Sequence, residues 1–172
     1  MTIEEEEMIA SLERGPVALS EALHGVSVEL ALRSPSPGKW SILECVEHLA
    51  LSEAYLFSGI QAAQVAASPL IDAEREARFK ARGVDRSRRA ESPQMVRPRG
   101  SFPTLADALQ ALQKDRQRTV QFVKDHAGED LRSRVTSIPP FGTLNCHDVL
   151  LLMAAHMVRH AIQIEEIKAA LA

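Results

Sequence analysis

The sequence predicts an all-α fold, a four-helix bundle with a long crossover between its second and third helices. Strong helix formers (Ala, Leu, Glu, Gln and Arg) dominate the chain. Four long helical segments each begin at a capping signal. The link between the second and third segments covers residues 68–104, which is too long for a tight hairpin and long enough to cross the bundle from end to end.

The first helix is expected over Ile3–Glu13, because Thr2 and Glu5 form a capping box. Pro16 then interrupts the pattern, but proline is also tolerated as the first residue of a new helical turn. We therefore expect a kinked helix that continues toward His24.

Three further helices have their own start signals. A second helix is expected over residues 42–67, behind a capping box formed by Ser41 and Glu44. The third is expected over residues 105–126 and the fourth over residues 146–170. Almost no strand pattern and no internal repeat accompany them.

Length and composition restrict the class of protein. A chain of 172 residues corresponds to one domain, residues 1–172. The expected partner of this domain is a small-molecule substrate. A net charge of −3 provides no basic field for nucleic acid, and the longest apolar run, residues 149–155, is far short of the ~20 residues that span a bilayer. Residues 4–7 are four glutamates, whereas a secretion signal carries positively charged residues near its start. The chain has only two cysteines, and they form no CxxC pair. We therefore expect a cytoplasmic location.

Positive charge is concentrated in the expected crossover, which we call the basic connector (residues 72–103). Residues 72–99 hold nine basic and five acidic side chains. One interpretation is a solvated, poorly packed connector, since most charge runs are surface. The other is a basic lid or anion-binding loop, which would recognise a carboxylate if it folded over a site.

Two histidines define the candidate chemistry of the last helix. His156 and His160 lie one turn apart in the middle of its apolar stripe, with Gln163 a further turn along. Imidazoles at this spacing can chelate one metal ion, and Gln163 could bond a ligand or line the pocket. The alternative is a pair of core histidines satisfied by other hydrogen bonds.

His48 is the candidate for a third ligand from the second helix. Its neighbours on the helical wheel are Glu44, Cys45, Ser52 and Tyr55, a polar stripe on an otherwise apolar helix. Glu44 is interpreted as a general base, a partner of a ligand, or a surface salt bridge. Ser52 and Tyr55 are candidates for the pocket wall. Cys45 is either an inert core residue or a pocket residue sensitive to oxidation.

Three neutral imidazoles with open positions form a catalytic type of metal site. Zinc suits this set best, and nickel, cobalt, copper and iron also accept imidazole ligands. Such an ion can activate either a water or a thiol, so the ligands alone leave hydrolysis and thiol transfer open. Because protonated histidine cannot ligate, metal content should drop as the pH falls through ~6.5.

Residues 35–50 (PSPGKWSILECVEHLA) resemble the signature of the DinB-like (DinB/YfiT) superfamily, in which a tryptophan precedes the second helix and a histidine lies within it. Residues 141–145 and 156–163 resemble the second half of that signature. The resemblance covers nearly the whole chain, in matching order and spacing. Trp40, the only tryptophan, is interpreted as a hydrophobic plug over the start of the second helix.

This resemblance implies an up-down-down-up bundle with a divalent metal held by His48, His156 and His160. It also implies a thiol-dependent S-transferase or related small-molecule chemistry that uses a low-molecular-weight thiol. A metal-dependent hydrolase and a non-catalytic metal-binding bundle are the alternatives. Since bundles of this family often pair, a homodimer is a further expectation.

Overall fold

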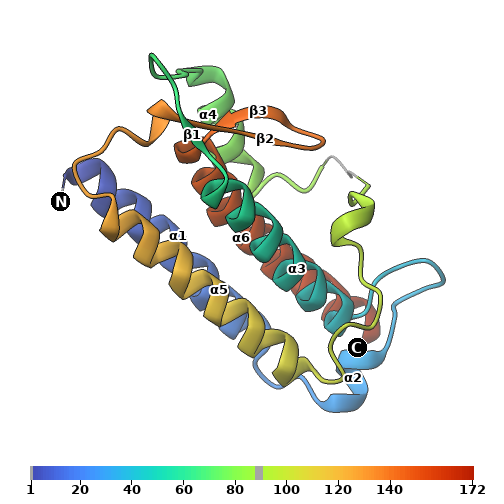
Figure 1. Ribbon diagram of the computed structural model, residues 1–172. Helices are drawn as coiled ribbons and strands as arrows, with labels where there is room; N and C mark the ends of the chain where they lie inside the picture. The colour runs from blue at the N-terminus through green and yellow to red at the C-terminus, as the bar shows by residue number, and fades with distance from the viewer. Residues whose placement is uncertain (1, 88–90) are drawn as a thin grey trace.

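Four long helices form the body of the protein in the computed structural model, which describes residues 2–87 and 91–172 (Figure 1). Arg88 and Arg89 of the basic connector lie outside the described residues. The long helices are α1 (Ile3–Ala22), α3 (Ile42–Gln61), α5 (Leu105–Asp125) and α6 (Cys146–Leu171).

Figure 1 shows α1 and α6 running from the end of the bundle that holds the N-terminus toward the end that holds the C-terminus, and α3 and α5 running the opposite way. Contacts at the two ends agree with this view. A carboxylate oxygen of Glu5 accepts the backbone N–H of Gly128 at the first end, and the Lys168 ammonium donates to the Ala22 carbonyl at the second.

The expected helix starts are confirmed, because the capping side chains make the predicted bonds. Ser41 and Glu44 form a reciprocal capping box at the start of α3. At the start of α6, the side chain of Asn145 accepts the backbone N–H of Asp148 at 2.7 Å.

The first helix runs on through Pro16 and ends at Ala22, which confirms the expected continuation toward His24. Leu12 and Leu19 are buried on either side of the proline. Packing of this face against α6 therefore offsets the hydrogen bond that proline cannot donate. Gly15 allows the close approach, since a Cβ there would lie 2.9 Å from the Cβ of Met157.

A small antiparallel sheet, with strand order β1-β2-β3, corrects the all-α expectation. It consists of β1 (Gln64–Val65), β2 (Arg134–Ile138) and β3 (Gly142–Asn145). Because Gln64 and Val65 pair with β2, the second long helix ends at Gln61 and not at residue 67.

The basic connector is partly helical. It contains α4 (Ala73–Arg82), whose Phe79 is buried, and the 3-10 helix η1 (Gln94–Val96), whose Val96 is buried. A Cβ on Gly83 would lie 3.2 Å from the backbone of Ala155, so the end of α4 packs closely on α6. A poorly packed connector is therefore the wrong interpretation for these two segments. The remaining short helices are α2 (Val28–Leu32) and η2 (Leu131–Ser133).

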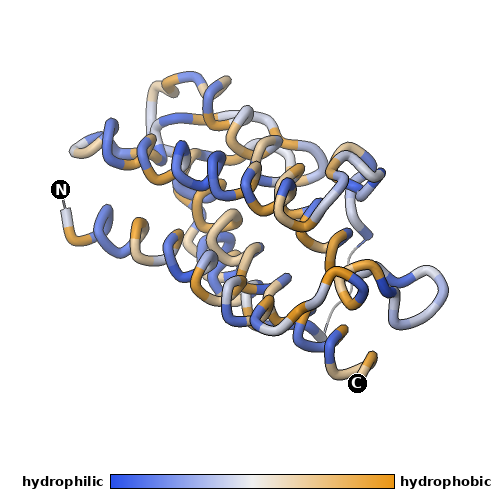
Figure 2. Tube along the Cα trace, turned by 90° about the horizontal axis from the view of Figure 1, so that it is seen from below, coloured by the Kyte–Doolittle hydropathy of each residue, from blue (hydrophilic) through white to orange (hydrophobic). Residues whose placement is uncertain are grey.

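The core runs along the inner faces of the long helices, and Figure 2 shows apolar and polar residues alternating along each of them. This is the pattern of helices with one buried face. Among the helices of the described residues, none has the length and apolar character that a membrane span requires.

Candidate metal centre

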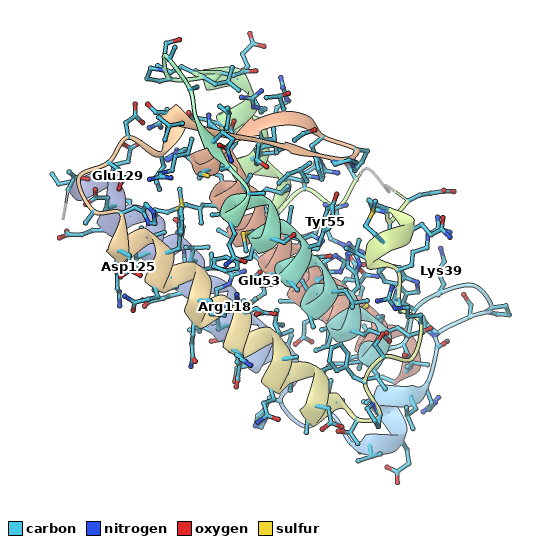
Figure 3. All side chains as sticks on the ribbon, viewed as in Figure 1. Lys39, Glu53, Tyr55, Arg118, Asp125 and Glu129 are labelled. Carbon is cyan, nitrogen blue, oxygen red and sulfur yellow. The ribbon has the colours of Figure 1, made fainter. Side chains whose placement is uncertain are left out.

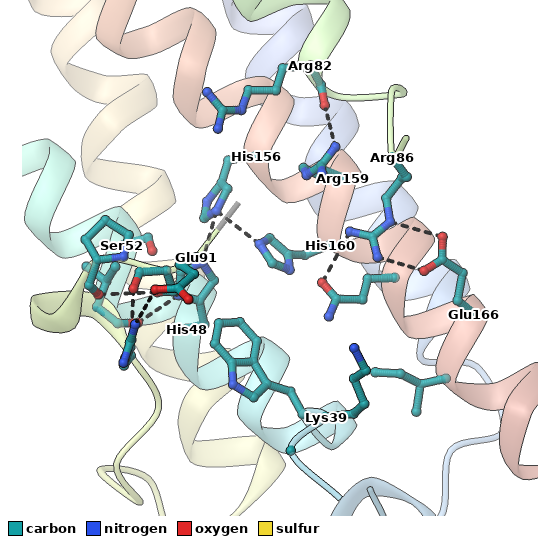
Figure 4. A pocket seen from close by; sticks show the side chains of 18 of the residues that line it. Lys39, His48, Ser52, Arg82, Arg86, Glu91, His156, Arg159, His160 and Glu166 are labelled. Atoms are coloured by element: carbon teal, nitrogen blue, oxygen red, sulfur yellow. Dashed lines mark hydrogen bonds and ion pairs between the residues drawn. The ribbon is translucent and has the colours of Figure 1, made fainter. Parts of the chain in front are cut away.

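Three histidine rings from α3 and α6 converge on one point (Figure 4). The Nε2 atom of His156 lies 3.1 Å from Nε2 of His48 and 3.1 Å from Nε2 of His160. One nitrogen from each ring lies within 4.8 Å of the other two. His48 and His160 are buried and His156 is half-buried, so the cluster has one open side.

Helix geometry and one backbone contact orient these rings. His156 and His160 share a face of α6 because they are four residues apart. The Nδ1–H of His48 donates to the carbonyl of Val96 at 2.7 Å. Since a carbonyl can only accept, this bond places the proton on Nδ1 and leaves the lone pair of His48 on Nε2.

Burial favours the neutral form of all three rings. Burial lowers the pKa of His48, and the bond to Val96 opposes this only partly. Burial, and then repulsion from the neighbouring histidines and arginines, holds the pKa values of His156 and His160 well below the ordinary value. The Nε2 atoms of His48 and His160 each lie within hydrogen-bond distance of Nε2 of His156, and the side chain of Gln163 also bonds the His160 ring. One nitrogen of each ring thus faces the same point.

A cavity of about 880 Å³ opens beside the histidines. Trp40 forms part of its wall, with its ring centroid 4.9 Å from that of His48 and 6.4 Å from that of His160. The rings of Trp40 and His160 are nearly parallel, at 22°. Trp40 thus contacts two of the histidines directly, a closer role than that of the expected plug over the helix start.

Cationic side chains from the connector and α6 surround the same cavity (Figure 4). The guanidinium of Arg86 forms two bonds to Glu166 and one to Gln163. Arg82 lies over the ring of Phe141, 5.8 Å from its centroid. Five cations and two acids line the cavity: Lys39, Arg82, Arg86, Arg97, Arg159, Glu91 and Glu166.

Ser52, Tyr55 and Gln163 line the cavity together with the histidines, as the pocket expectation proposes. The Tyr55 hydroxyl donates to the Pro139 carbonyl at 3.2 Å. The hydroxyl oxygen of Ser52 is buried without a hydrogen-bond partner among the described residues.

Glu44 and Cys45 are not part of the cavity wall. The Glu44 carboxylate accepts the backbone N–H of Ser41 at 2.7 Å, so it caps α3, and the structure gives its role as general base no support. Cys45 is fully buried in the core, and burial raises the pKa of its thiol to about 12. The inert-core interpretation of Cys45 therefore holds over the oxidation-sensitive one.

Sequence reasoning missed the parts of the site contributed by backbone and loops. Val96 acts through its carbonyl, which leaves no signal in residue type. Arg159 donates to the carbonyls of Arg82 and Asp85, joining α6 to the connector. Its position between His156 and His160 on the helix was the one signal available for it.

Comparison with known proteins identifies the superfamily of this chain. A model of the DinB superfamily matches residues 11–164. The chain belongs to the DinB superfamily, and its three-histidine cluster lies on the two helices that carry the signature.

Two solved structures share the fold. One is YfiT from Bacillus subtilis, described as a probable metal-dependent hydrolase with an unusual four-helix bundle topology, with 17% identity and a TM-score of 0.62 over 99% of this chain and 90% of that one. The other is TT2238, described as a four-helix bundle protein, with 18% identity and a TM-score of 0.58 over 94% of this chain and 98% of that one. No curated protein sequence matches this chain significantly.

Proposed function

We propose that the protein is a metal-dependent enzyme in which His48, His156 and His160 hold one divalent cation. The observation that carries this proposal is the convergence of three neutral imidazole nitrogens within 4.8 Å of one another beside an open cavity. Zinc suits three nitrogen ligands with a vacant fourth position, and nickel, cobalt, copper or iron would also accept them.

The donor set fits such an ion. Each ring presents Nε2, and burial keeps the rings unprotonated, as metal ligation requires. When bound, the ion would supply a Lewis acid that activates a water or thiol nucleophile and polarises the substrate. The chain itself orients His48 through Val96, and the ring of Trp40 lies beside that of His48.

The expected substrate is a small anion. Lys39 and Arg82 line the cavity, and neither forms an ion pair with an acid among residues 2–87 and 91–172. The excess of cations over acids on the cavity wall attracts negative charge, and a guanidinium matches a carboxylate in two-point geometry. We therefore propose that the described parts of the basic connector, residues 72–87 and 91–103, form an anion-binding wall beside the histidines.

Hydrolysis and thiol transfer both suit this arrangement. Hydrolysis is supported by the fold shared with YfiT, described as a probable metal-dependent hydrolase. S-transfer from a low-molecular-weight thiol is supported by the cavity of about 880 Å³, large enough for a thiol and an acceptor together. A non-catalytic metal-binding bundle is the remaining alternative.

Metal loading followed by two assays tests the proposal. The chelator-stripped protein should regain one zinc ion per chain, and cobalt or copper should quench the fluorescence of Trp40, which lies beside His48. Hydrolysis of small carboxylate esters and amides is then compared with metal-dependent consumption of thiols. Metal binding without either activity would leave the non-catalytic alternative, and no metal binding would refute the proposal.

We also assign the bundle the up-down-down-up order with a crossover between α3 and α5, supported by the helix directions in Figure 1. A cytoplasmic location, a homodimer and the lack of a nucleic-acid partner stay predictions from the sequence.

A further inference from the structure

Glu47, the residue before His48, is a buried carboxylate outside the cavity wall. It is 2% exposed, and it accepts three backbone N–H groups, from Arg99 at 2.9 Å, Gly100 at 3.2 Å and Ser101 at 2.8 Å. Burial raises the pKa of Glu47, but these bonds outweigh it and the net pKa is lowered. Glu47 is therefore a charged acceptor for a loop about fifty residues away in sequence.

The backbone of this loop is shaped for the carboxylate. Gly100 has a φ of +74°, in the left-handed region that glycine adopts without strain. Successive N–H groups in such a turn can point at one anion. Glu47 and Gly100 together fix the path of residues 99–101, at the end of the basic connector.

The fixed segment follows directly on the residue that orients a metal ligand. Val96 ends η1 three residues before Arg99, and its side chain is buried. Its carbonyl accepts the Nδ1–H of His48 at 2.7 Å. Neighbouring residues of α3 thus hold both ends of one short loop: Glu47 holds 99–101, and His48 meets Val96.

We propose that Glu47 is a positioning residue of the metal centre, which holds residues 99–101 so that the Val96 carbonyl fixes the tautomer and orientation of His48. This inference rests on the proposed function, because it assigns Glu47 a role in metal binding. Groups that bond the second nitrogen of a ligating histidine commonly account for a 10–100-fold change in metal affinity. Glu47 acts one step further out, through the loop.

Two variants and a matched control test this role. Glu47→Gln removes the charge and presents an amide N–H₂ to the loop donors, whereas Glu47→Asp keeps the charge on a shorter side chain. The control is Glu5→Gln, because the Glu5 carboxylate also accepts two backbone N–H groups, from Thr2 and Gly128, at the far end of the bundle.

The readouts are the dissociation constant for Zn²⁺, measured by competition with a chelator, and the tautomer of His48 in metal-free protein, measured by ¹⁵N NMR. Glu47→Gln should weaken Zn²⁺ binding about tenfold or more and populate the Nε2–H form of His48. Glu47→Asp should recover part of the Zn²⁺ affinity and part of the Nδ1–H form of His48. Glu5→Gln should bind Zn²⁺ within about twofold of the wild type.

The proposal is overturned if Glu47→Gln retains the wild-type affinity and tautomer, or if Glu5→Gln causes an equal loss. If Glu47→Gln does not fold, Glu47→Asp decides, and unfolding of both variants would make Glu47 purely structural. Failure of the proposed function looks different: wild-type protein would not bind Zn²⁺, while the tautomer of metal-free His48 would still report on Glu47.

Discussion

Two faces of α3 carry buried polar groups, and the two groups differ in whether the chain supplies their bonding partners. On the face toward α5, Glu53 meets Arg116, and both side chains are nearly fully buried. On the face toward α6, His48 meets His156 and His160. Figure 3 shows the two sides of the helix, with Glu53 directed toward α5 and Tyr55 away from it.

The difference lies in whether the chain supplies the partners. Arg116 donates two bonds to the Glu53 carboxylate, one to the Leu12 carbonyl and one to the Met153 carbonyl, and Thr119 adds a bond to Glu53. This cluster joins all four long helices and is satisfied from within. The histidine cluster has three Nε2 atoms facing one another, and these atoms could hold a cation from outside. A satisfied buried cluster stabilises a fold, and an unsatisfied one beside a cavity indicates a binding site.

The largest expected effect concerns the satisfied cluster. Arg116→Met leaves the Glu53 carboxylate buried without its cation, and the free energy of unfolding should fall by about 3–5 kcal/mol. Urea denaturation measures this, and the double variant with Glu53→Gln should recover part of the loss. A decrease below about 1 kcal/mol would remove the contrast between the two faces.

Replacement of the proposed ligands should abolish metal binding and leave the free energy of unfolding nearly unchanged. His156→Ala and His160→Ala should each abolish stoichiometric Zn²⁺ binding, because two imidazoles alone hold the ion weakly. The free energy of unfolding of metal-free His156→Ala should change by about 1 kcal/mol or less, since that ring is only half-buried. Elemental analysis and urea denaturation check both results, and retained zinc would contradict the ligand assignment.

Acid should weaken the metal-free protein through the histidines. Their folded-state pKa values are lowered, whereas the unfolded chain titrates near ~6.5, so the unfolded state binds more protons below that pH. Stability is therefore complete above ~6.5 and is lost as the pH falls toward the folded-state values. Melting temperatures of metal-free protein between pH 7.5 and 5.5 measure the slope.

His147 contributes to the same slope, because burial and Arg132 lower its pKa as well. Asparagine at positions 48, 156 and 160 together should flatten the slope while His147 stays in place. A slope unchanged in that variant would show that the cluster is not held neutral by the fold.

A smaller effect, on the binding of a small anion, is expected from a substitution at the cavity wall. Arg82→Gln should weaken binding of succinate to the metal-loaded protein about tenfold, since a charge-assisted pair is lost. Arg78→Gln is the matched control on the same helix, because Arg78 is exposed, pairs with Glu74 and is outside the cavity wall. Equal affinities for both variants, by calorimetry, would refute the role of Arg82.

The smallest effect is expected at Cys45. Cys45 is fully buried, and burial raises the pKa of its thiol to about 12. We therefore expect no reaction of this thiol with thiol reagents in the native state at neutral pH. Reaction at the rate of an unfolded control would contradict the placement of Cys45 in the core.

The sequence predicts those features that depend on local spacing. The pair His156 and His160 share a helix face by geometry alone, and the caps at Ser41 and Asn145 mark helix starts accurately. The sheet was missed because β1 has only two residues, Gln64 and Val65, and forms through a distant partner.

Features that depend on tertiary contacts could likewise not be predicted from the sequence. The Val96 carbonyl and the three N–H groups held by Glu47 are backbone atoms, which every residue type carries. The placement of α4 depends on the burial of Phe79 and on the close approach of Gly83 to Ala155 of α6, and charge composition does not reveal such packing.

The most direct test of the account is anomalous diffraction from crystals of the zinc-loaded protein, recorded on both sides of the zinc absorption edge. The account predicts one peak about 2.0–2.1 Å from Nε2 of each of His48, His156 and His160. A peak elsewhere, or His48 turned away from an ion bound by the other two rings, would contradict it.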